Sequence, residues 1–308
     1  MVCDDVLKAL GNTPLIRLRR MAQGCAEVLV KFEGVNIGGS IKTRTAFGMV
    51  EEAERSGALR PGCTIVEATS GNQGIGLALV AAVKGYKCVI VMPDNMSIER
   101  RKLMKAYGAE IVLVPAGESI AEAIENARNK AKELAAADPN VWLANQFSNP
   151  ANPAIHSRTT ALEIIEQVGG KIDAFCAGIG TGGTITGVGR VLKQRWPNVL
   201  VAAVEPTKAA LLAGGKISHH AMQGMGDGVM PDILDRSIID RVILVEDEEA
   251  IQTARDLARR EGLLVGVSSG ANTWAALQLA RELGPGKTVV TVLPDTGERY
   301  LSTDLYND

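Results

Sequence analysis

The sequence has little of what marks secreted, membrane-spanning or nucleic-acid-binding proteins. Its five cysteines are odd in number and show no Cys-x-x-Cys spacing, which argues against a disulfide framework or a structural zinc site. No signal-peptide pattern or apolar run of bilayer-spanning length is found. The formal net charge is −2, and we interpret the densest basic run, Arg100 to Lys102, as a solvated helix face. We therefore expect a cytoplasmic protein that binds neither membranes nor nucleic acid.

Histidine is also scarce, which limits the catalytic classes to consider. The chain has three histidines, with no evident Ser/His/Asp grouping and no metal-ligand spacing. His156 opens a predicted helix after a proline-rich turn, so we interpret it as a packing or capping residue. His219 and His220 lie in a predicted loop, where they either contact a substrate or are exposed to solvent. Hydrolase and metal-centre functions are therefore disfavoured.

What the sequence does contain is a regular alternation of strands and helices. A chain of 308 residues with 46% hydrophobic content suggests a globular protein of two domains. Strands are predicted at 27–32, 63–66, 87–92, 109–114, 141–144, 173–177, 199–204, 241–246, 263–267 and 287–293. Helices are predicted between them, among others at 75–84, 154–168, 183–195, 248–261 and 271–283. This pattern predicts an α/β fold with mostly parallel sheets flanked by helices. The segment 206–236 breaks the pattern and is predicted to be a long functional loop.

A lysine stands at the start of one predicted helix. In Asn36-Ile-Gly-Gly-Ser-Ile-Lys-Thr-Arg44 the glycines and Ser40 predict a loop, and helical periodicity begins at Ile41. Lys42 would then lie in the first turn, where the helix dipole disfavours a cation. A lowered pKa would favour a reactive amine of the kind that forms Schiff bases. An ordinary solvated lysine is the alternative interpretation.

Two further loops each join a predicted strand to a predicted helix. They are Glu67-Ala-Thr-Ser-Gly-Asn-Gln-Gly74 and Gly178-Ile-Gly-Thr-Gly-Gly-Thr184. Backbone N–H groups at a helix N-terminus bind anions, so both loops are candidate anion sites. The second loop also fits the dinucleotide fingerprint, with Glu205 about twenty residues further on. We favour a lone phosphate, because the loop continues as Gly-Gly-Thr, and we interpret Glu205 as a surface carboxylate at a strand end.

Together the lysine and the two loops resemble the fold-type II pyridoxal phosphate enzymes of the cysteine synthase (O-acetylserine sulfhydrylase) and cystathionine β-synthase family. The resemblance runs from Gly11-Asn-Thr-Pro-Leu15 to Gly297-Glu-Arg-Tyr-Leu-Ser302. It implies a tryptophan synthase β-like fold in which residues 35–146 form an N-terminal domain. Residues 1–34 and 147–308 would form the larger domain, with the cofactor between the two. The segment 87–132 would close over the substrate. A homodimer and a serine acetyltransferase partner are further expectations.

The resemblance also implies roles for individual residues. Lys42 would carry pyridoxal 5′-phosphate as a Schiff base and then act as general base on the substrate. Asn72 would donate to the 3′ oxygen of the cofactor, and the neutral hydroxyl of Ser268 would meet its pyridine nitrogen, which suits β-elimination. Phosphate contacts are implied for Gly180, Thr181, Gly182, Gly183 and Thr184. Substrate contacts are implied for Thr69, Ser70, Gly71, Gln73, Gln146 and Gly224.

Three positions depart from the pattern of this family. Thr43 replaces the aspartate that usually follows the lysine, and Gln73 replaces a threonine, which would bring an amide into the substrate pocket. Asp227 stands where cysteine synthases commonly carry alanine and cystathionine β-synthases tyrosine. This carboxylate either faces solvent or acts as general base on water or another nucleophile.

The implied reaction is a β-substitution on a serine- or cysteine-type amino acid through an aminoacrylate. The leading hypothesis is the synthesis of cysteine from O-acetyl-L-serine and sulfide. The alternative is an L-cysteine hydroxy-lyase that releases hydrogen sulfide, with Asp227 activating water and repelling hydrosulfide. A NAD-binding oxidoreductase and a catalytically silent binding protein are minor alternatives. The sequence does not separate the first two hypotheses.

Overall fold

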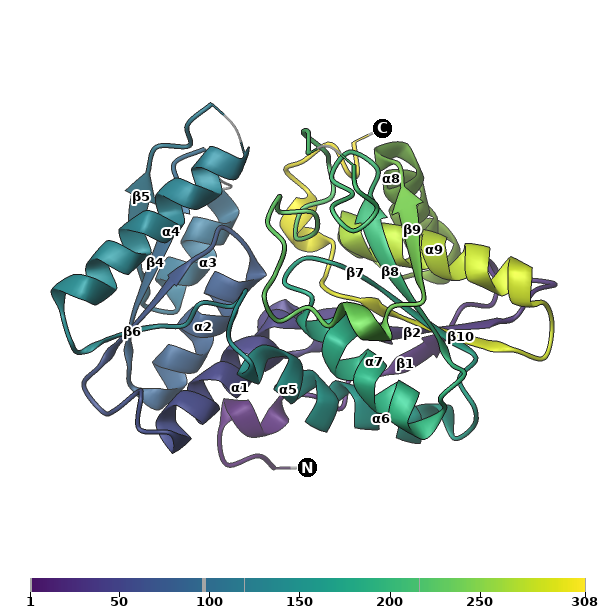
Figure 1. Ribbon diagram of the computed structural model, residues 1–308, viewed down its shortest axis with the longest axis horizontal. Helices are drawn as coiled ribbons and strands as arrows, with labels where there is room; N and C mark the ends of the chain where they lie inside the picture. Colours follow the sequence, from purple (N-terminus) through teal and green to yellow (C-terminus); the bar gives the residue numbers. More distant parts are fainter. Residues whose placement is uncertain (1, 96–97, 119, 216, 308) are drawn as a thin grey trace.

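The structure is a computed structural model that describes residues 2–95, 98–118, 120–215 and 217–307. Figure 1 shows two β-sheets side by side, each flanked by helices. One sheet has four strands and the other six. The α/β fold with mostly parallel sheets that the sequence predicts is confirmed.

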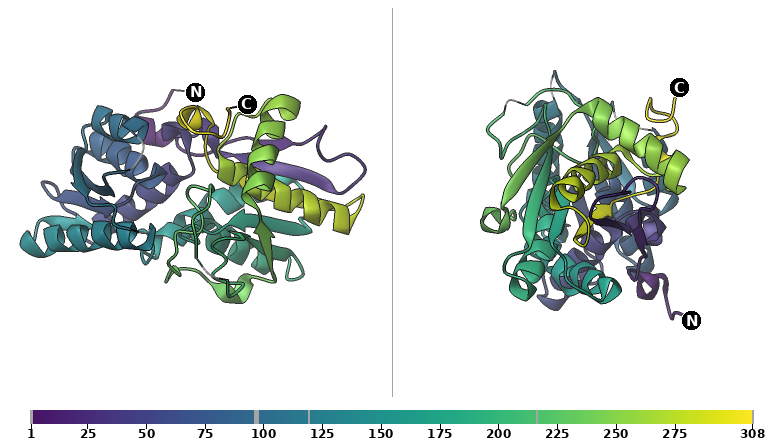
Figure 2. Two further views of the ribbon diagram at one scale, coloured as in Figure 1. Left: turned by 90° about the horizontal axis from the view of Figure 1, so that it is seen from above. Right: turned by 90° about the vertical axis from the view of Figure 1, so that its right-hand side faces the viewer.

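The four-stranded sheet is parallel throughout, with the strand order β5-β4-β3-β6. Its strands are β3 (Thr64–Ala68), β4 (Lys87–Pro93), β5 (Glu110–Val114) and β6 (Val141–Leu143). Its helices are α1 (Lys42–Arg55), α2 (Asn72–Lys84), α3 (Ile98–Ala106) and α4 (Ile120–Ala137). Successive side chains of a strand point to opposite faces, so Ile65 packs into the core with α1 and α2, and Val66 into the core with α4. Figure 2 shows α4 on the opposite side of this sheet from α1 and α2.

The six-stranded sheet has the order β1-β2-β10-β7-β8-β9, and only β1 runs antiparallel to its neighbour. Its strands are β1 (Leu15–Arg17), β2 (Glu27–Phe32), β7 (Ala174–Gly178), β8 (Leu200–Pro206), β9 (Arg241–Val245) and β10 (Thr288–Leu293). Its helices are α5 (Ala151–Arg158), α6 (Thr160–Val168), α7 (Gly183–Arg195), α8 (Asp247–Asp256) and α9 (Val267–Leu283). Short 3₁₀ turns occur at Val6–Ala9, Glu33–Val35, Ile37–Gly39, Arg236–Ile238 and Glu298–Tyr300. The start of the chain therefore pairs with its last strand.

Three predicted elements differ in the structure. The helix expected at 154–168 is two helices, because Thr159 leaves helical geometry at φ −127° and ψ −75°. The helix expected at 248–261 ends at Asp256 and continues as a π-helical turn, Leu257–Glu261. No strand forms at 263–267: within the described residues Val265 makes only an isolated bridge to Thr296. The apolar residues of that segment are buried in the core, so their hydrophobicity reflects packing and not a strand.

A buried network of charges fixes the start of α1 to the six-stranded sheet. Arg44 donates to Glu33 (Nε to Oε2, 2.9 Å) and to Glu163 (Nη1 to Oε1, 2.6 Å). Lys31 of β2 pairs with Glu163 of α6 at 2.7 Å and donates to the carbonyl oxygen of Thr13. Buried charges are tolerated only when they are paired in this way. The network lies two residues beyond Lys42 and so determines where that lysine sits.

Candidate active site

A pocket of about 1000 Å³ is lined by segments that belong to both sheets. It is lined by segments that follow β3, β4, β5, β6, β7, β8 and β10, at the carboxyl ends of these strands. Ligands of open α/β sheets bind at this edge, because the loops there converge. Every site residue predicted from the sequence lines this pocket: Lys42, Thr69, Ser70, Gly71, Asn72, Gln73, Gln146, Gly180, Thr181, Gly182, Gly183, Thr184, Gly224, Asp227 and Ser268.

Lys42 is the first residue of α1, as the sequence predicts. The preceding loop is held by the hydrogen bond from the Ile41 N–H to the Pro294 carbonyl oxygen, 2.8 Å. Burial lowers the pKa of Lys42 from 10.5, and the charge of Asp227 opposes this shift. The lowered pKa that the sequence predicts is therefore caused by burial, and not by the helix dipole on which that prediction was based. A lowered pKa makes the neutral, nucleophilic amine more accessible near neutral pH.

The loop 178–184 packs closely against its neighbours at the start of α7. Gly182 has φ +76°, which favours glycine. A Cβ on Gly180 would lie 2.4 Å from the carbonyl oxygen of Gly224, and one on Gly183 would lie 2.0 Å from Asn152 Oδ1. The Asn152 amide donates to Thr181 Oγ1 at 3.0 Å. The result is a compact turn whose backbone N–H groups open α7, a site suited to a phosphate.

Glu67 links the loop after β3 to Gln146. Its carboxyl group accepts from the backbone N–H groups of Ala68 and Gln146, each at 3.1 Å. Burial raises the pKa of Glu67 to about 8, and these two hydrogen bonds oppose the shift. Gln73 lines the pocket, but its amide nitrogen donates to Met49 Sδ in α1 at 3.7 Å. The amide nitrogen of Gln73 is therefore directed to the buried side of α1.

Asp227 lies in the loop 207–235, is half-buried and lines the pocket beside Gly180. Burial raises its pKa, and the charges of Lys42 and His220 oppose this shift. His220 accepts from the Met222 N–H at Nδ1 (3.2 Å), and its Nε2 lies 3.2 Å from the Gly226 carbonyl oxygen. His220 therefore donates from Nε2 and folds the loop beside Asp227. His219 lines the pocket too and is exposed.

Arg100 does not lie on a solvated helix face, so the interpretation of Arg100 to Lys102 as such a face is wrong for this residue. Arg100 is only 6% exposed and lines the pocket. It donates to Gln223 Oε1 at 2.6 Å and to the Ser70 carbonyl oxygen at 3.4 Å, with its guanidinium 5.8 Å from the Tyr300 ring centroid. The sequence does indicate this burial, because Arg100 stands one helical turn before Met104 and so shares the face of α3 that carries this buried residue. Asp295, Arg299 and Tyr300 near the C-terminus also received no role, although Arg299 and Tyr300 belong to the motif Gly297-Glu-Arg-Tyr-Leu-Ser302 at which the resemblance ends.

The interpretation of Glu205 as a surface carboxylate is also wrong. Glu205 is 3% exposed, and its carboxylate accepts from the backbone N–H groups of Leu212 and Ala213. Those bonds occupy the oxygens that a dinucleotide ribose would need, which weakens the oxidoreductase alternative further. His156 is buried between the hydroxyl groups of Thr45 and Thr160, as expected of a packing residue.

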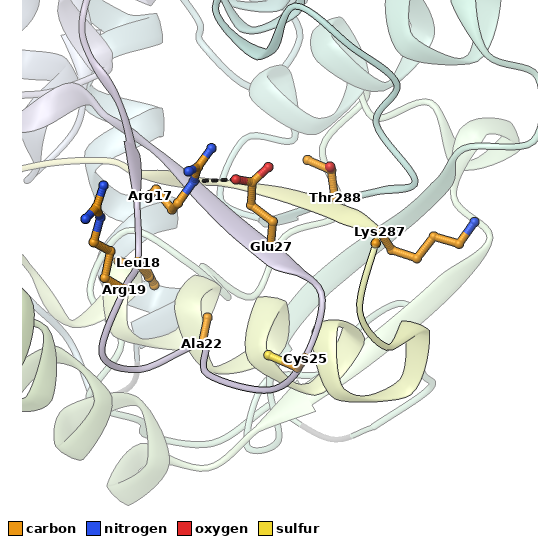
Figure 3. A pocket seen from close by; sticks show the side chains of 9 residues that line it. Arg17, Leu18, Arg19, Ala22, Cys25, Glu27, Lys287 and Thr288 are labelled. Carbon is orange, nitrogen blue, oxygen red and sulfur yellow. Dashed lines mark ion pairs between the residues drawn. The ribbon is translucent and has the colours of Figure 1, made fainter.

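A second, smaller hollow of about 660 Å³ lies at the edge of the six-stranded sheet (Figure 3). Arg17 forms an ion pair there with Glu27, and Lys287 extends away from that pair. None of the predicted site residues lines it. Over the part of the chain that the structure describes, no group of three or more His, Cys, Asp or Glu side chains could hold a metal ion. Across those residues there is also no helix of the length and apolarity that a membrane crossing requires.

Known proteins resemble the chain over nearly its whole length. The family model described as "Pyridoxal-phosphate dependent enzyme" matches residues 6–295. A cysteine synthase of Staphylococcus aureus is 51% identical over 306 residues, covering 99% of this chain and 97% of that protein. The crystal structure of an O-ureido-L-serine synthase superposes with a TM-score of 0.94 at 46% identity, covering 99% and 96% of the two chains. That of a hydrogen sulfide-producing enzyme from Fusobacterium nucleatum gives 0.93 at 41% identity, covering 98% and 99%.

Proposed function

Because this chain belongs to the pyridoxal-phosphate dependent enzyme family and is of the cysteine synthase type, we propose that it forms L-cysteine from O-acetyl-L-serine and sulfide. The observation that carries this proposal is the convergence of Lys42 and the loop 178–184 on one pocket. A reactive amine and a phosphate cradle in one pocket are the two features that pyridoxal phosphate requires.

The residues present fit this cofactor. The lowered pKa of Lys42 suits an amine that binds an aldehyde covalently. The N–H groups at the start of α7, with the hydroxyls of Thr181 and Thr184, suit the phosphate. Ser268, in the first turn of α9, offers a neutral hydroxyl for the pyridine nitrogen. When bound, pyridoxal phosphate supplies an electron sink for breaking bonds at the α-carbon of an amino acid.

The protein's own residues would bind, orient and move protons around that group. Thr69, Ser70 and Gln146 would hold the substrate α-carboxylate through hydroxyl, amide and backbone donors. Glu67 supports this arrangement, because it ties the backbone of Gln146 to β3, the strand that leads into Thr69 and Ser70. Lys42, as a neutral amine, would take the proton from the substrate α-carbon.

A second candidate function rests on Asp227. A carboxylate beside Lys42 in the pocket would disfavour the anionic hydrosulfide and could activate a water molecule instead. Water attack would convert L-cysteine into serine and release sulfide. The likeness to a hydrogen sulfide-producing enzyme supports this alternative. The two candidate functions share every other residue of the site.

The deciding experiment is to assay the purified, cofactor-saturated enzyme with two sets of substrates. Cysteine formation from O-acetyl-L-serine and sulfide, with little turnover of L-cysteine alone, supports the synthase. Rapid release of sulfide and serine from L-cysteine, abolished in Asp227→Asn, supports the hydroxy-lyase, and pyruvate in place of serine indicates simple elimination. Lys42→Ala should remove activity and the visible absorbance of the covalently bound cofactor. Arg241→Ala, which removes an exposed ion pair with Glu282 outside the pocket, serves as control.

Membership of this family supports further proposals about organisation. We propose a homodimer in the cytoplasm, to be tested by light scattering, and binding to a serine acetyltransferase, to be tested by co-purification. We also propose that residues 35–146 form one domain, and 1–34 with 147–308 the other, with closure of 87–132 over the substrate. The two separate sheets are consistent with that division. Hydrogen exchange with and without substrate would test the closure.

A further inference from the structure

We propose that Arg299 and Asp295 are positioning residues that fix the side-chain amide of Asn72, so that it presents an N–H group to the pocket. Neither residue acquires a role from the sequence motifs described above. The inference rests on the proposed function, because it takes pyridoxal phosphate as the ligand that receives this N–H group.

The two ends of the Asn72 amide have partners of opposite character. Arg299 donates from Nη1 to Asn72 Oδ1, and Asn72 donates from Nδ2 to Asp295 Oδ2 at 2.7 Å. A guanidinium can only donate, so turning the amide over would place its NH₂ group against another donor. The same rotation would place the amide oxygen against the Asp295 carboxyl oxygen. Both contacts therefore select one orientation, in which the second N–H of Nδ2 remains for a ligand.

Asp295 is itself held firmly. It is 1% exposed, and its Oδ2 also accepts from Tyr300 Oη at 2.7 Å. Among the residues that the structure describes, its buried Oδ1 has no hydrogen-bond partner, and a Cβ on Gly266 would come within 2.3 Å of it. Burial raises the pKa of Asp295, and the hydrogen bond from Tyr300 and the charge of Arg299 oppose this shift. A carboxyl group packed this tightly cannot rotate away from Asn72.

Arg299 connects Asn72 to the loop that precedes Lys42. Its Nη2 donates to the carbonyl oxygen of Gly38 at 3.1 Å. A Cβ on Gly39 would lie only 2.3 Å from that nitrogen, so the guanidinium fits because the loop has glycine there. Asp295 also forms an isolated bridge with Ser40. The segment that carries Asp295 and Arg299 thus contacts both the lysine loop and the first residue of α2, so it fixes the position of one relative to the other.

The test is a double-mutant cycle on Arg299 and Asn72. Apoproteins of wild type, Arg299→Met, Asn72→Ala and the double variant are titrated with pyridoxal phosphate, and the visible absorption maximum and the apparent Kd are recorded. We expect Arg299→Met to weaken binding about tenfold, as for loss of a charge-assisted hydrogen bond, and to shift the absorption maximum. In the Asn72→Ala background the same substitution should have a much smaller effect on both quantities, limited to the lost contact with the Gly38 carbonyl oxygen. Arg241→Met, which removes an exposed ion pair with Glu282, should match wild type.

Two results would overturn the inference. One is an unchanged spectrum and Kd in Arg299→Met, and the other is an equal effect of that substitution with and without Asn72. Circular dichroism melting of each apoprotein checks folding, and Arg299→Lys, which retains the cation but not the fork of donors, replaces the Met variant should that one unfold. Wild-type protein that binds no pyridoxal phosphate would overturn the proposed function instead.

Discussion

Lys42 and Asp227 interact as opposite charges within the pocket, one from the start of α1 and the other from the loop 207–235. Burial lowers the pKa of Lys42 and raises that of Asp227, and the attraction between the two side chains opposes both shifts. Burial therefore favours the neutral amine and the neutral acid, while their attraction favours the ion pair. The pKa of the base is thus lowered and that of the acid raised, the directions that general acid–base catalysis requires of such a pair.

The first prediction concerns the pH dependence of sulfide release from L-cysteine. Only the Asp227 carboxylate can act as a base, so activity that depends on it should fall as pH drops through its raised pKa. Asp227→Asn should lower the rate about a hundredfold or more and remove this acidic limb. The measurement is kcat/KM against pH, with Asp232→Asn, an exposed change in the same loop, as control. An acidic limb that persists in Asp227→Asn contradicts the assignment.

The second prediction concerns the buried charge network. Arg44 and Lys31 hold the pKa of Glu163 at about 2, against 4.5 in the unfolded chain. The unfolded state therefore binds more protons in this range, and the stabilisation, about 3 kcal/mol, is full above about pH 4.5 and lost as pH falls toward 2.

Glu163→Gln should accordingly lower the free energy of unfolding by about 3 kcal/mol at neutral pH, because two buried cations lose a charged partner. Urea denaturation measures this change. Glu133→Gln removes an exposed ion pair with Lys130 and should cost less than about 0.5 kcal/mol. A similar decrease in the free energy of unfolding in both variants would show that the buried network stabilises the protein no more than an exposed ion pair does.

The third prediction concerns Glu67, whose contribution to the free energy of unfolding changes with pH in the opposite direction from that of Glu163. Because burial raises the pKa of Glu67 to about 8, the folded state retains a proton that the unfolded state releases above its ordinary pKa of 4.5. Stability should therefore decline as pH rises from about 4.5 to about 8. At low pH, Glu67→Gln should lower the free energy of unfolding by about 1 kcal/mol, because one backbone hydrogen bond is lost. As pH rises, wild type loses stability and the variant does not, so the difference between the two should shrink. Urea denaturation at several pH values tests this, with the exposed Glu110→Gln as control; parallel curves for wild type and Glu67→Gln would refute it.

The fourth prediction concerns the phosphate loop. A Cβ on Gly183 would lie 2.0 Å from Asn152 Oδ1, and Asn152 is the residue that bonds both Thr181 and the Gln146 carbonyl oxygen. Gly183→Ala should therefore displace Asn152, destabilise the protein by about 1–3 kcal/mol and weaken binding of pyridoxal phosphate. Gly170→Ala, whose Cβ would have its nearest neighbour at 3.9 Å, should change neither quantity. Wild-type affinity for pyridoxal phosphate in Gly183→Ala would contradict the prediction, because it would show that the loop 178–184 accommodates the Cβ without losing its ligand-binding geometry.

Local patterns in the sequence determined the α/β fold and the positions of the main motifs. Periodicity and loop chemistry placed Lys42 at a helix start and predicted α7 with the bounds that the structure has. These features depend on neighbouring residues, and neighbours in the chain are what a sequence displays. Where apolar residues signalled burial without a strand, as at 263–267, the same reasoning failed, because a core position and a buried strand have the same composition.

Only the tertiary structure decided which polar residues meet. Arg100 belongs to a type that is usually exposed, and it is buried because distant segments supply Gln223 and Ser70. The orientation of the Asn72 amide depends on Arg299, which lies more than two hundred residues along the chain. Asp227 faces the pocket because its loop folds back beside Lys42. Such contacts depend on how the two sheets pack together, and no local pattern in the sequence encodes that packing.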